Sequence, residues 1–254
     1  MNPKNLKTNK FILIVLFFIY STYSIYAQEP LTSSSSDLAK LYKTAESIYT
    51  LNDELINGHM YPIRDTRIQG NPYLHDDFWK TGTVFIHNRQ YPKVLVRYNL
   101  VIDELILKAN INDSTERIIS INKNQVDSFR IHNSLFVNTS VLSQNKKQNT
   151  GTYYELIYNN NAVFVVKKYE KRFIDMYNNI TPYGKYSSLK SDIFLIDNDK
   201  SVNINKMRSL LNHFDKKFHK SIKEFIRNKH IDYRNISNTQ LKELIEFCNS
   251  LTLN

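Results

Sequence analysis

The acid pairs Asp76-Asp77 and Asp103-Glu104, with seven scattered histidines, are the side chains that we consider for catalysis or metal binding. The densest group is His75-Asp76-Asp77, and the second acid pair is Asp103-Glu104. Neighbouring residues on a strand point to opposite faces, and no two histidines have the H-x-x-x-H spacing that puts two ligands on one side of a helix. Paired carboxylates of a hydrolase must face each other across the substrate from separate segments. The local sequence therefore encodes neither a preformed metal site nor a facing acid pair.

Nucleophile and cofactor motifs are also missing from the sequence. There is no G-x-S-x-G elbow, and the single cysteine, Cys248, has no companion histidine motif. The five glycines are spread through the chain, so they form no phosphate-binding loop. We therefore expect no cofactor, and the residues do not favour an enzyme. Cys248 lies among leucines at helical spacing and predicts a buried thiol, with a disulfide between two chains as the alternative.

Five residues form the candidate interaction or structural motif of the chain: Arg97, Tyr98, Asn99, Asp103 and Glu104. Arg97 and Asp103 flank the Tyr98-Asn99 core, and we expect them to form a polar pair on one face of a sheet. Such pairs set strand register more often than they bind a ligand. Tyrosines on the neighbouring strands suit a carbohydrate or protein contact, and they suit packing equally well.

The segments that must position these residues are extended. Between residues 83 and 196 they alternate in polarity, are rich in Val, Ile and Tyr, and are separated by turns of Asn and Ser. The clearest hairpin joins Tyr153–Tyr158 to Ala162–Tyr169 through three asparagines. Another joins Thr83–His87 to Lys93–Leu100 through residues 88–92. The other expected strands are 105–108, 117–121, 126–131, 135–139 and 188–196.

Helical periodicity occurs at both ends of the chain. Leu38–Ile56 predicts a short N-terminal helix. From Asn203 the apolar residues again have helical spacing, and a capping box at Ser237 and Gln240 marks the start of the last helix. The three apolar segments are 204–214, 218–226 and 241–248.

These patterns predict an α+β protein, mainly an antiparallel β meander followed by C-terminal helices. The meander forms either an open sheet or a partly closed barrel. The expected organisation is a signal peptide at 1–27, a spacer and short helix at 28–58, a β-rich domain at 59–200, and a helical segment at 201–254 that packs on it.

The first 27 residues have the layout of a secretory signal peptide. Lys4, Lys7 and Lys10 give a basic start, Phe11–Tyr20 is apolar, and we expect cleavage after Ala27, with an uncleaved anchor as the alternative. Removing three lysines lowers the formal net charge from +10 to +7. No later segment has the roughly 18 to 20 apolar residues that a membrane helix needs. We expect a periplasmic, outer-membrane-associated or secreted protein, without a nucleic-acid partner because no binding module is recognisable.

Short motifs between residues 70 and 107 resemble a loose family of exported, uncharacterised β-rich proteins of Bacteroidota. One motif is Gly70-Asn71-Pro72-Tyr73, which fits the family's G-x-P-Y-L pattern together with Leu74. The other is the Y-N-x-x-x-D-E-L core, from Tyr98 to Leu105. The resemblance implies a β-rich domain in the periplasm or at the cell surface that ends in short helices. It implies no activity.

The leading hypothesis is a noncatalytic, envelope-associated interaction module with an envelope protein or glycan as its partner. An open sheet offers such a partner an unpaired edge. The alternative is a small-ligand or lipid carrier, in which the meander closes into a barrel with an apolar cavity. A hydrolase assembled from distant carboxylates and histidines is the third hypothesis.

Overall fold

The computed structural model describes residues 40, 55–62, 64–111, 115–142, 151–160, 163–175, 177–197 and 200–252. The expected signal peptide lies outside these ranges. The expected N-terminal helix lies outside them too, apart from Lys40, Leu55 and Ile56. Residues 51–254 form one compact unit, and all of the structure discussed below belongs to it.

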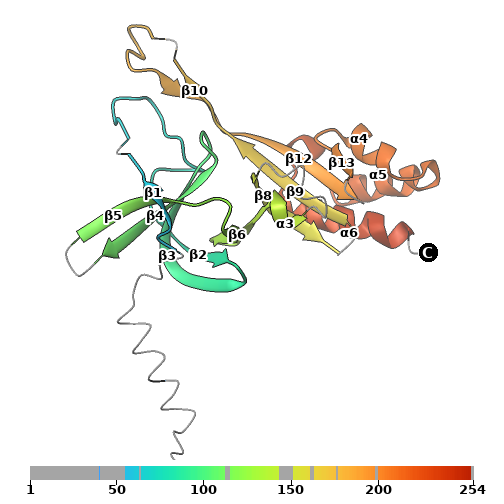
Figure 1. Ribbon diagram of the computed structural model, residues 1–254. Helices are drawn as coiled ribbons and strands as arrows, with labels where there is room; N and C mark the ends of the chain where they lie inside the picture. The colour runs from blue at the N-terminus through green and yellow to red at the C-terminus, as the bar shows by residue number, and fades with distance from the viewer. Residues whose placement is uncertain are drawn as a thin grey trace, which may run out of the picture. The chain divides into compact units, whose positions relative to one another are not determined.

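Eleven antiparallel strands form one sheet in the described ranges, in the order β1-β5-β4-β3-β2-β6-β7-β8-β9-β12-β13 (Figure 1). A separate pair, β10 and β11, continues the hairpin of β9 and β12. The strands of the large sheet are β1 Gly58–Met60, β2 Lys80–Ile86, β3 Arg89–Asn99, β4 Glu104–Ile111, β5 Thr115–Ile121, β6 Val126–Ile131, β7 Ser134–Asn138, β8 Tyr153–Asn159, β9 Val163–Glu170, β12 Lys190–Asp197 and β13 Lys200–Asn203. The small pair is β10 Phe173–Ile174 and β11 Lys185–Tyr186.

The large sheet is open. β1 and β13 are its two edge strands, and within the described residues they do not pair with each other. The α+β class and the antiparallel meander are confirmed, and of the two forms predicted for the meander the structure has the open sheet.

The β2–β3 hairpin turns earlier than predicted. His87 and Asn88 form a two-residue connection, and both have positive φ (48° and 65°), as a type I′ turn requires. The predicted loop at 88–92 is wrong, because these residues are mostly part of β3. Pro92, which has no N–H for a ladder bond, lies where the β2–β3 register shifts, beside Lys93 at φ 59°.

The C-terminal helices follow β13. They are α4 Met207–His213, α5 His219–Asn228 and α6 Asn238–Thr252, and a short helix, α3 Thr139–Leu142, follows β7. The capping box is confirmed, because the Gln240 amide donates to Ser237 Oγ (3.2 Å) and the Ser237 amide donates to Gln240 Oε1 (3.1 Å). No helix in the described ranges has both the length and the apolarity to cross a lipid bilayer.

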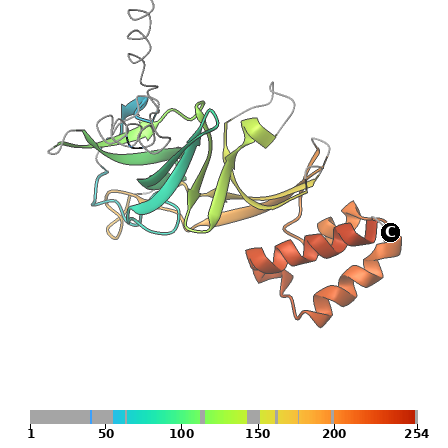
Figure 2. The ribbon, with the colours of Figure 1, turned by 90° about the horizontal axis from the view of Figure 1, so that it is seen from below.

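Two apolar clusters hold the unit together. The first covers one face of β2 to β8, and its centre is a group of edge-to-face and stacked rings with centroids 4.9 to 5.8 Å apart. These rings are Tyr98, Phe129, Phe136 and Tyr153. The second cluster packs the three C-terminal helices, which lie together in Figure 2, with residues of β9 and β12.

A buried carboxylate joins α6 to the sheet. Glu155 on β8 is 3% exposed and accepts hydrogen bonds from the Ser134 hydroxyl, from Tyr169 Oη (2.6 Å) and from Asn238 Nδ2 (3.0 Å). Lys167 Nζ donates to Asn238 Oδ1 (2.9 Å), so the first residue of α6 is bound to two strands. A buried charge of this kind is tolerated only when its oxygens are paired.

Candidate binding site

A pocket of about 560 Å³ lies beside the turn between β3 and β4, and we call it the turn pocket. Its walls come from β1 and the residues after it, from the turn itself and from the β10–β11 pair. The polar lining residues are His59, Tyr61, Arg64, Asp65, Asn99 and Glu104. The aromatic and apolar lining residues include Ile68, Pro72, Val101, Ile102, Phe173 and Tyr186.

The β3–β4 turn explains why the Y-N-x-x-x-D-E-L segment contains an asparagine and an aspartate. Asn99 Oδ1 accepts from the backbone amides of Val101 (3.0 Å) and Ile102 (3.4 Å), which starts the turn. Asp103 closes the turn with a φ of 56°. Asn and Asp are the residues that best combine such side-chain bonding with left-handed backbone.

Asn99 and Glu104 form the half of this segment that faces the turn pocket. Asn99 is 3% exposed, and its Nδ2 donates to Tyr61 Oη (2.7 Å). Burial raises the pKa of Tyr61 well above its usual 10, so the phenol stays protonated. Glu104 accepts the Ser120 hydroxyl, and His59 Nε2 lies 3.6 Å from Glu104 Oε2.

Tyr98 and Asp103 form the other half, which belongs to the core. Tyr98 is 2% exposed within the aromatic cluster, and its hydroxyl donates to Asp103 Oδ1. The Lys123 ammonium binds the second oxygen of Asp103. Burial, followed by the Asp103 charge, raises the pKa of Tyr98 well above 10. This half holds the turn in place.

The predicted pair between Arg97 and Asp103 is wrong. Arg97 alternates with Tyr98 along β3 and therefore lies on the opposite face of the sheet, whereas the turn directs Asp103 back toward the core. Arg97 Nη1 lies 3.1 Å from Asp77 Oδ1, and its guanidinium lies over the Trp79 ring at 4.1 Å. The contact with Asp77 is an ion pair without hydrogen-bond alignment.

The segment Asn71–Tyr73 forms one wall, and a buried lysine holds it. Lys171, 8% exposed, donates to the Tyr73 carbonyl (2.7 Å) and to both the carbonyl and Oδ1 of Asn71 (3.1 Å each). The Pro72 carbonyl accepts from the Leu100 amide (2.9 Å), which ties this wall to the turn. The two motifs that resemble the exported family are therefore neighbours in space.

β10, β11 and the described part of the connection between them carry several exposed apolar side chains, and we call residues 173–175 and 177–186 the aromatic hairpin. The rings of Phe173 and Tyr186 pack edge to face at 5.7 Å beside the turn pocket, and the Tyr186 amide donates to the Gln69 carbonyl (2.9 Å). Four large side chains of this hairpin are exposed: Phe173 (39%), Tyr177 (64%), Ile180 (85%) and Tyr183 (42%).

Each of the acid groups that suggested chemistry already has a partner in the protein. Asp76 accepts from Lys80 Nζ (2.7 Å), which lowers the pKa of this carboxyl, while Asp77 pairs with Arg64 and Arg97. Asp103 and Glu104 have separate partners on opposite sides of the turn. Among the described residues, no three His, Cys, Asp or Glu side chains gather as metal ligands do.

Most of the turn pocket was not predicted from the sequence. Asn99 and Glu104 were among the candidate residues, but Tyr61, Phe173 and Tyr186 were not. Pro72, which also lines the pocket, belongs to the motif Gly70-Asn71-Pro72-Tyr73, to which the sequence assigned no site.

Comparison with known proteins adds no relative, because no family model, curated protein or solved structure matches this chain. Fold and site together describe an α+β protein with an open antiparallel sheet and a pocket at one of its turns.

Proposed function

We propose that this chain is an exported, noncatalytic interaction module of the cell envelope, and that it binds a segment of a partner protein. The surface for this segment consists of the turn pocket and the aromatic hairpin. The proposal depends on one observation: four large apolar side chains are exposed along a hairpin that also forms one wall of a pocket. Exposed apolar surface of this kind marks interaction sites.

The polar groups of the turn pocket favour a partner without strong charge. Asp65 is bonded to Arg67, which lowers the pKa of Asp65 to about 2, and Arg64 is paired with Asp77. Glu104 has a hydroxyl donor in Ser120. Because these groups already have partners, binding must come mainly from aromatic and aliphatic contacts, which dominate the centres of protein interfaces.

Export is supported by the basic, apolar and small-residue order of residues 1–27 and by the resemblance to exported proteins of Bacteroidota. A noncatalytic role is supported by the separate cation partners of Asp76 and Asp77.

The carrier hypothesis required the meander to close into a barrel, and the sheet is open. The face that such a barrel would enclose is filled by the rings around Phe129 and Phe136.

A photo-crosslinking residue at position 180, in the protein as its host exports it, tests this proposal. We expect position 180 to capture one reproducible envelope protein, and the same residue at position 141 to capture none. Val141 is a matched control because it is also an exposed apolar side chain (57%) but lies on α3.

The captured protein is then identified, purified and titrated against variants. Ile180→Ser should weaken its binding about tenfold, as expected for an interface side chain of this size, whereas Val141→Ser should not. Equal effects of the two variants, or capture of glycan in place of protein, would reject a protein segment as the occupant.

A further inference from the structure

The charge of the chain is concentrated in its helical segment. Residues 206–235 contain nine Lys or Arg and three Asp or Glu, so this segment alone contributes +6 of the formal net charge of +10. All nine basic side chains are exposed. The segment therefore produces a positive field over α4 and α5 that attracts anions.

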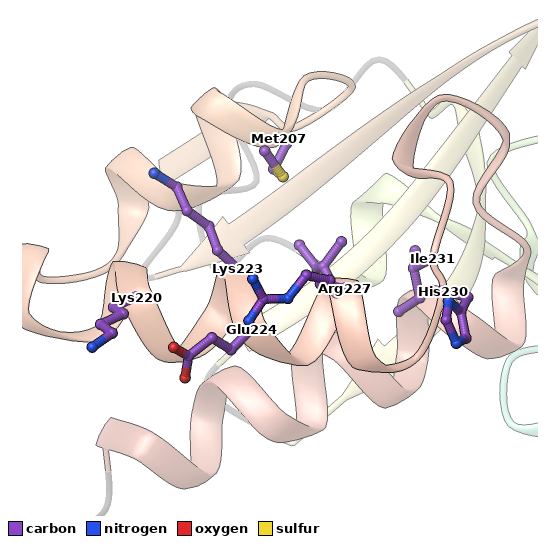
Figure 3. A pocket seen from close by; sticks show the side chains of 8 residues that line it. Met207, Lys220, Lys223, Glu224, Arg227, His230 and Ile231 are labelled. Carbon is purple, nitrogen blue, oxygen red and sulfur yellow. The ribbon is translucent and has the colours of Figure 1, made fainter.

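A second pocket, of about 500 Å³, lies along α5 within this segment, and we call it the basic pocket. Ile222 and Ile226 are buried on the inner side of α5, so Lys220, Lys223 and Arg227 lie on its outer side at helical spacing. Figure 3 shows these side chains along α5, with Met207 supplied by α4 and His230 by the end of α5.

The cations of the basic pocket are not neutralised by the protein. Within the described part of the chain, Lys220, Lys223 and Arg227 form no ion pair, whereas Lys108 and Lys123 near the sheet, and Lys229 and Lys242 in the helical segment, each have an acidic partner. Glu224 is the single acid of the lining. Three cations against one carboxylate leave an excess of two positive charges.

The shape of the basic pocket is fixed by the end of α5. The Ile231 amide donates to the Ile226 carbonyl (3.0 Å), and the amide of His230, at φ 51°, donates to the Arg227 carbonyl (3.1 Å). These bonds occupy the last carbonyls of the helix, which would otherwise repel an anion. Ile231, 8% exposed, and Ile226 give the pocket an apolar side.

We infer that the basic pocket binds a phosphate group that is attached to a less polar body. A guanidinium holds phosphate through two parallel hydrogen bonds, and lysines add point charges. The apolar side formed by Met207, Ile226 and Ile231 suits the remainder of the ligand. The phosphate can belong to a lipid headgroup or to a small soluble phosphoester. This site is independent of the turn pocket.

The test uses the whole protein from its host and a paired charge reversal, Lys223→Glu with Arg227→Glu. The matched control is Lys216→Glu with Lys217→Glu, which makes the same change of charge at two exposed lysines of the same segment outside the pocket. The probes are vesicles of phosphatidylcholine with phosphatidic acid, vesicles with oleate at equal surface charge, and glycerol 3-phosphate in solution. Melting temperature shows whether each variant is folded.

We expect the pocket variant to lose about tenfold or more of its affinity for phosphate probes, and the control to stay within about twofold of wild type. Binding to phosphatidic acid vesicles alone would identify a lipid headgroup, and binding to glycerol 3-phosphate as well would identify a soluble phosphoester. Equal losses in the two variants, equal binding to oleate vesicles, or no binding to any probe would overturn the inference. If the pocket variant fails to fold, the single change Arg227→Gln is compared with Lys217→Gln in the same assays.

Discussion

Tyr98 and Asn99 are adjacent in β3, yet they serve different surfaces because consecutive side chains of a strand point to opposite faces. Tyr98 extends into the aromatic cluster and binds Asp103, whereas Asn99 shapes the turn and binds Tyr61. Neither side chain is free to react. Together they hold the β3–β4 turn at the edge of the turn pocket, with the core on one side and the pocket on the other.

Removing the hydroxyl of Tyr98 should destabilise the fold. Tyr98→Phe leaves Asp103 with Lys123 as a partner but removes a buried charge-assisted hydrogen bond. The loss of this bond should lower the free energy of unfolding by about 1–3 kcal/mol. Urea unfolding measures the loss. Tyr154→Phe is the matched control, because the Tyr154 hydroxyl forms no hydrogen bond with the described residues and its ring stacks on Phe194. If Tyr154→Phe lowered the free energy of unfolding as much as Tyr98→Phe does, the hydrogen bond to Asp103 would add no stability beyond the loss of a hydroxyl.

Cys248 should resist thiol reagents while the protein is folded. The residue is 0% exposed on α6, and burial raises the pKa of its thiol to about 12. Because the thiolate is the reactive form, modification at pH 8 should follow unfolding and should accelerate in urea in proportion to the unfolded fraction. Reaction with a disulfide reagent, followed spectroscopically, measures this rate. Fast labelling of the native protein would contradict the buried thiol.

At the scale of elements, β2 depends on a glycine at its contact with β6. A Cβ at Gly82 would lie 2.6 Å from the Arg130 carbonyl oxygen and 2.9 Å from Val96 Cγ2. The carbonyl belongs to the backbone of β6, so the strands themselves must move apart to make room.

Gly82→Ala should therefore lower the free energy of unfolding by about 1–3 kcal/mol, the usual range for overpacking. Amide hydrogen exchange should become faster in β2 and β6 first. Thr81→Ala, at an exposed position of the same strand, should leave both measurements nearly unchanged. Unchanged exchange in β6 after Gly82→Ala would argue against this close approach.

The sequence predicted elements with a clear period and missed those without one. Val126–Ile131 was placed without error because Asn- and Ser-containing turns bound it, and the start of the last helix because Ser237 and Gln240 have the spacing of a capping box, whose two bonds they form. β13 was missed, since Lys200–Asn203 contains a single apolar residue. The Arg97–Asp103 pair was misjudged because spacing along a chain does not reveal how a turn with positive φ redirects a side chain.

The turn pocket illustrates the same limit. Asn99 and Glu104 stood out in the sequence because they belong to the Y-N-x-x-x-D-E-L motif. Tyr61, Phe173 and Tyr186 did not, because the pairings that bring them together join segments more than a hundred residues apart. Local periodicity contains no information about such pairings.

At the scale of the whole molecule, buried phenols should make the fold sensitive to alkali. Burial raises the pKa of seven tyrosines above their ordinary 10: Tyr61, Tyr98, Tyr153, Tyr154, Tyr169, Tyr186 and Tyr233. Above pH 10 the unfolded chain loses these protons while the folded chain keeps them, so stability falls as pH rises. Burial lowers the pKa of Lys167 and Lys171, which opposes this trend below pH 10.5, but two lysines are outnumbered by seven tyrosines.

Titration at the phenolate absorbance band tests this prediction. The seven tyrosines with a raised pKa should ionise only together with loss of the fold, seen by circular dichroism. Reversible ionisation of every tyrosine in a protein that stays folded would contradict it.

Lys171 holds Asn71 and Tyr73 across a separation of about a hundred residues, and the wall that it supports faces the ring of Tyr186. A chain made from its N-terminus has synthesised the first wall long before the lysine and the aromatic hairpin exist. The lining of the turn pocket is thus incomplete in every chain that ends before Tyr186, and the partner that we propose would not recognise such a chain. Binding would then stabilise only chains in which the first wall and the aromatic hairpin have come together.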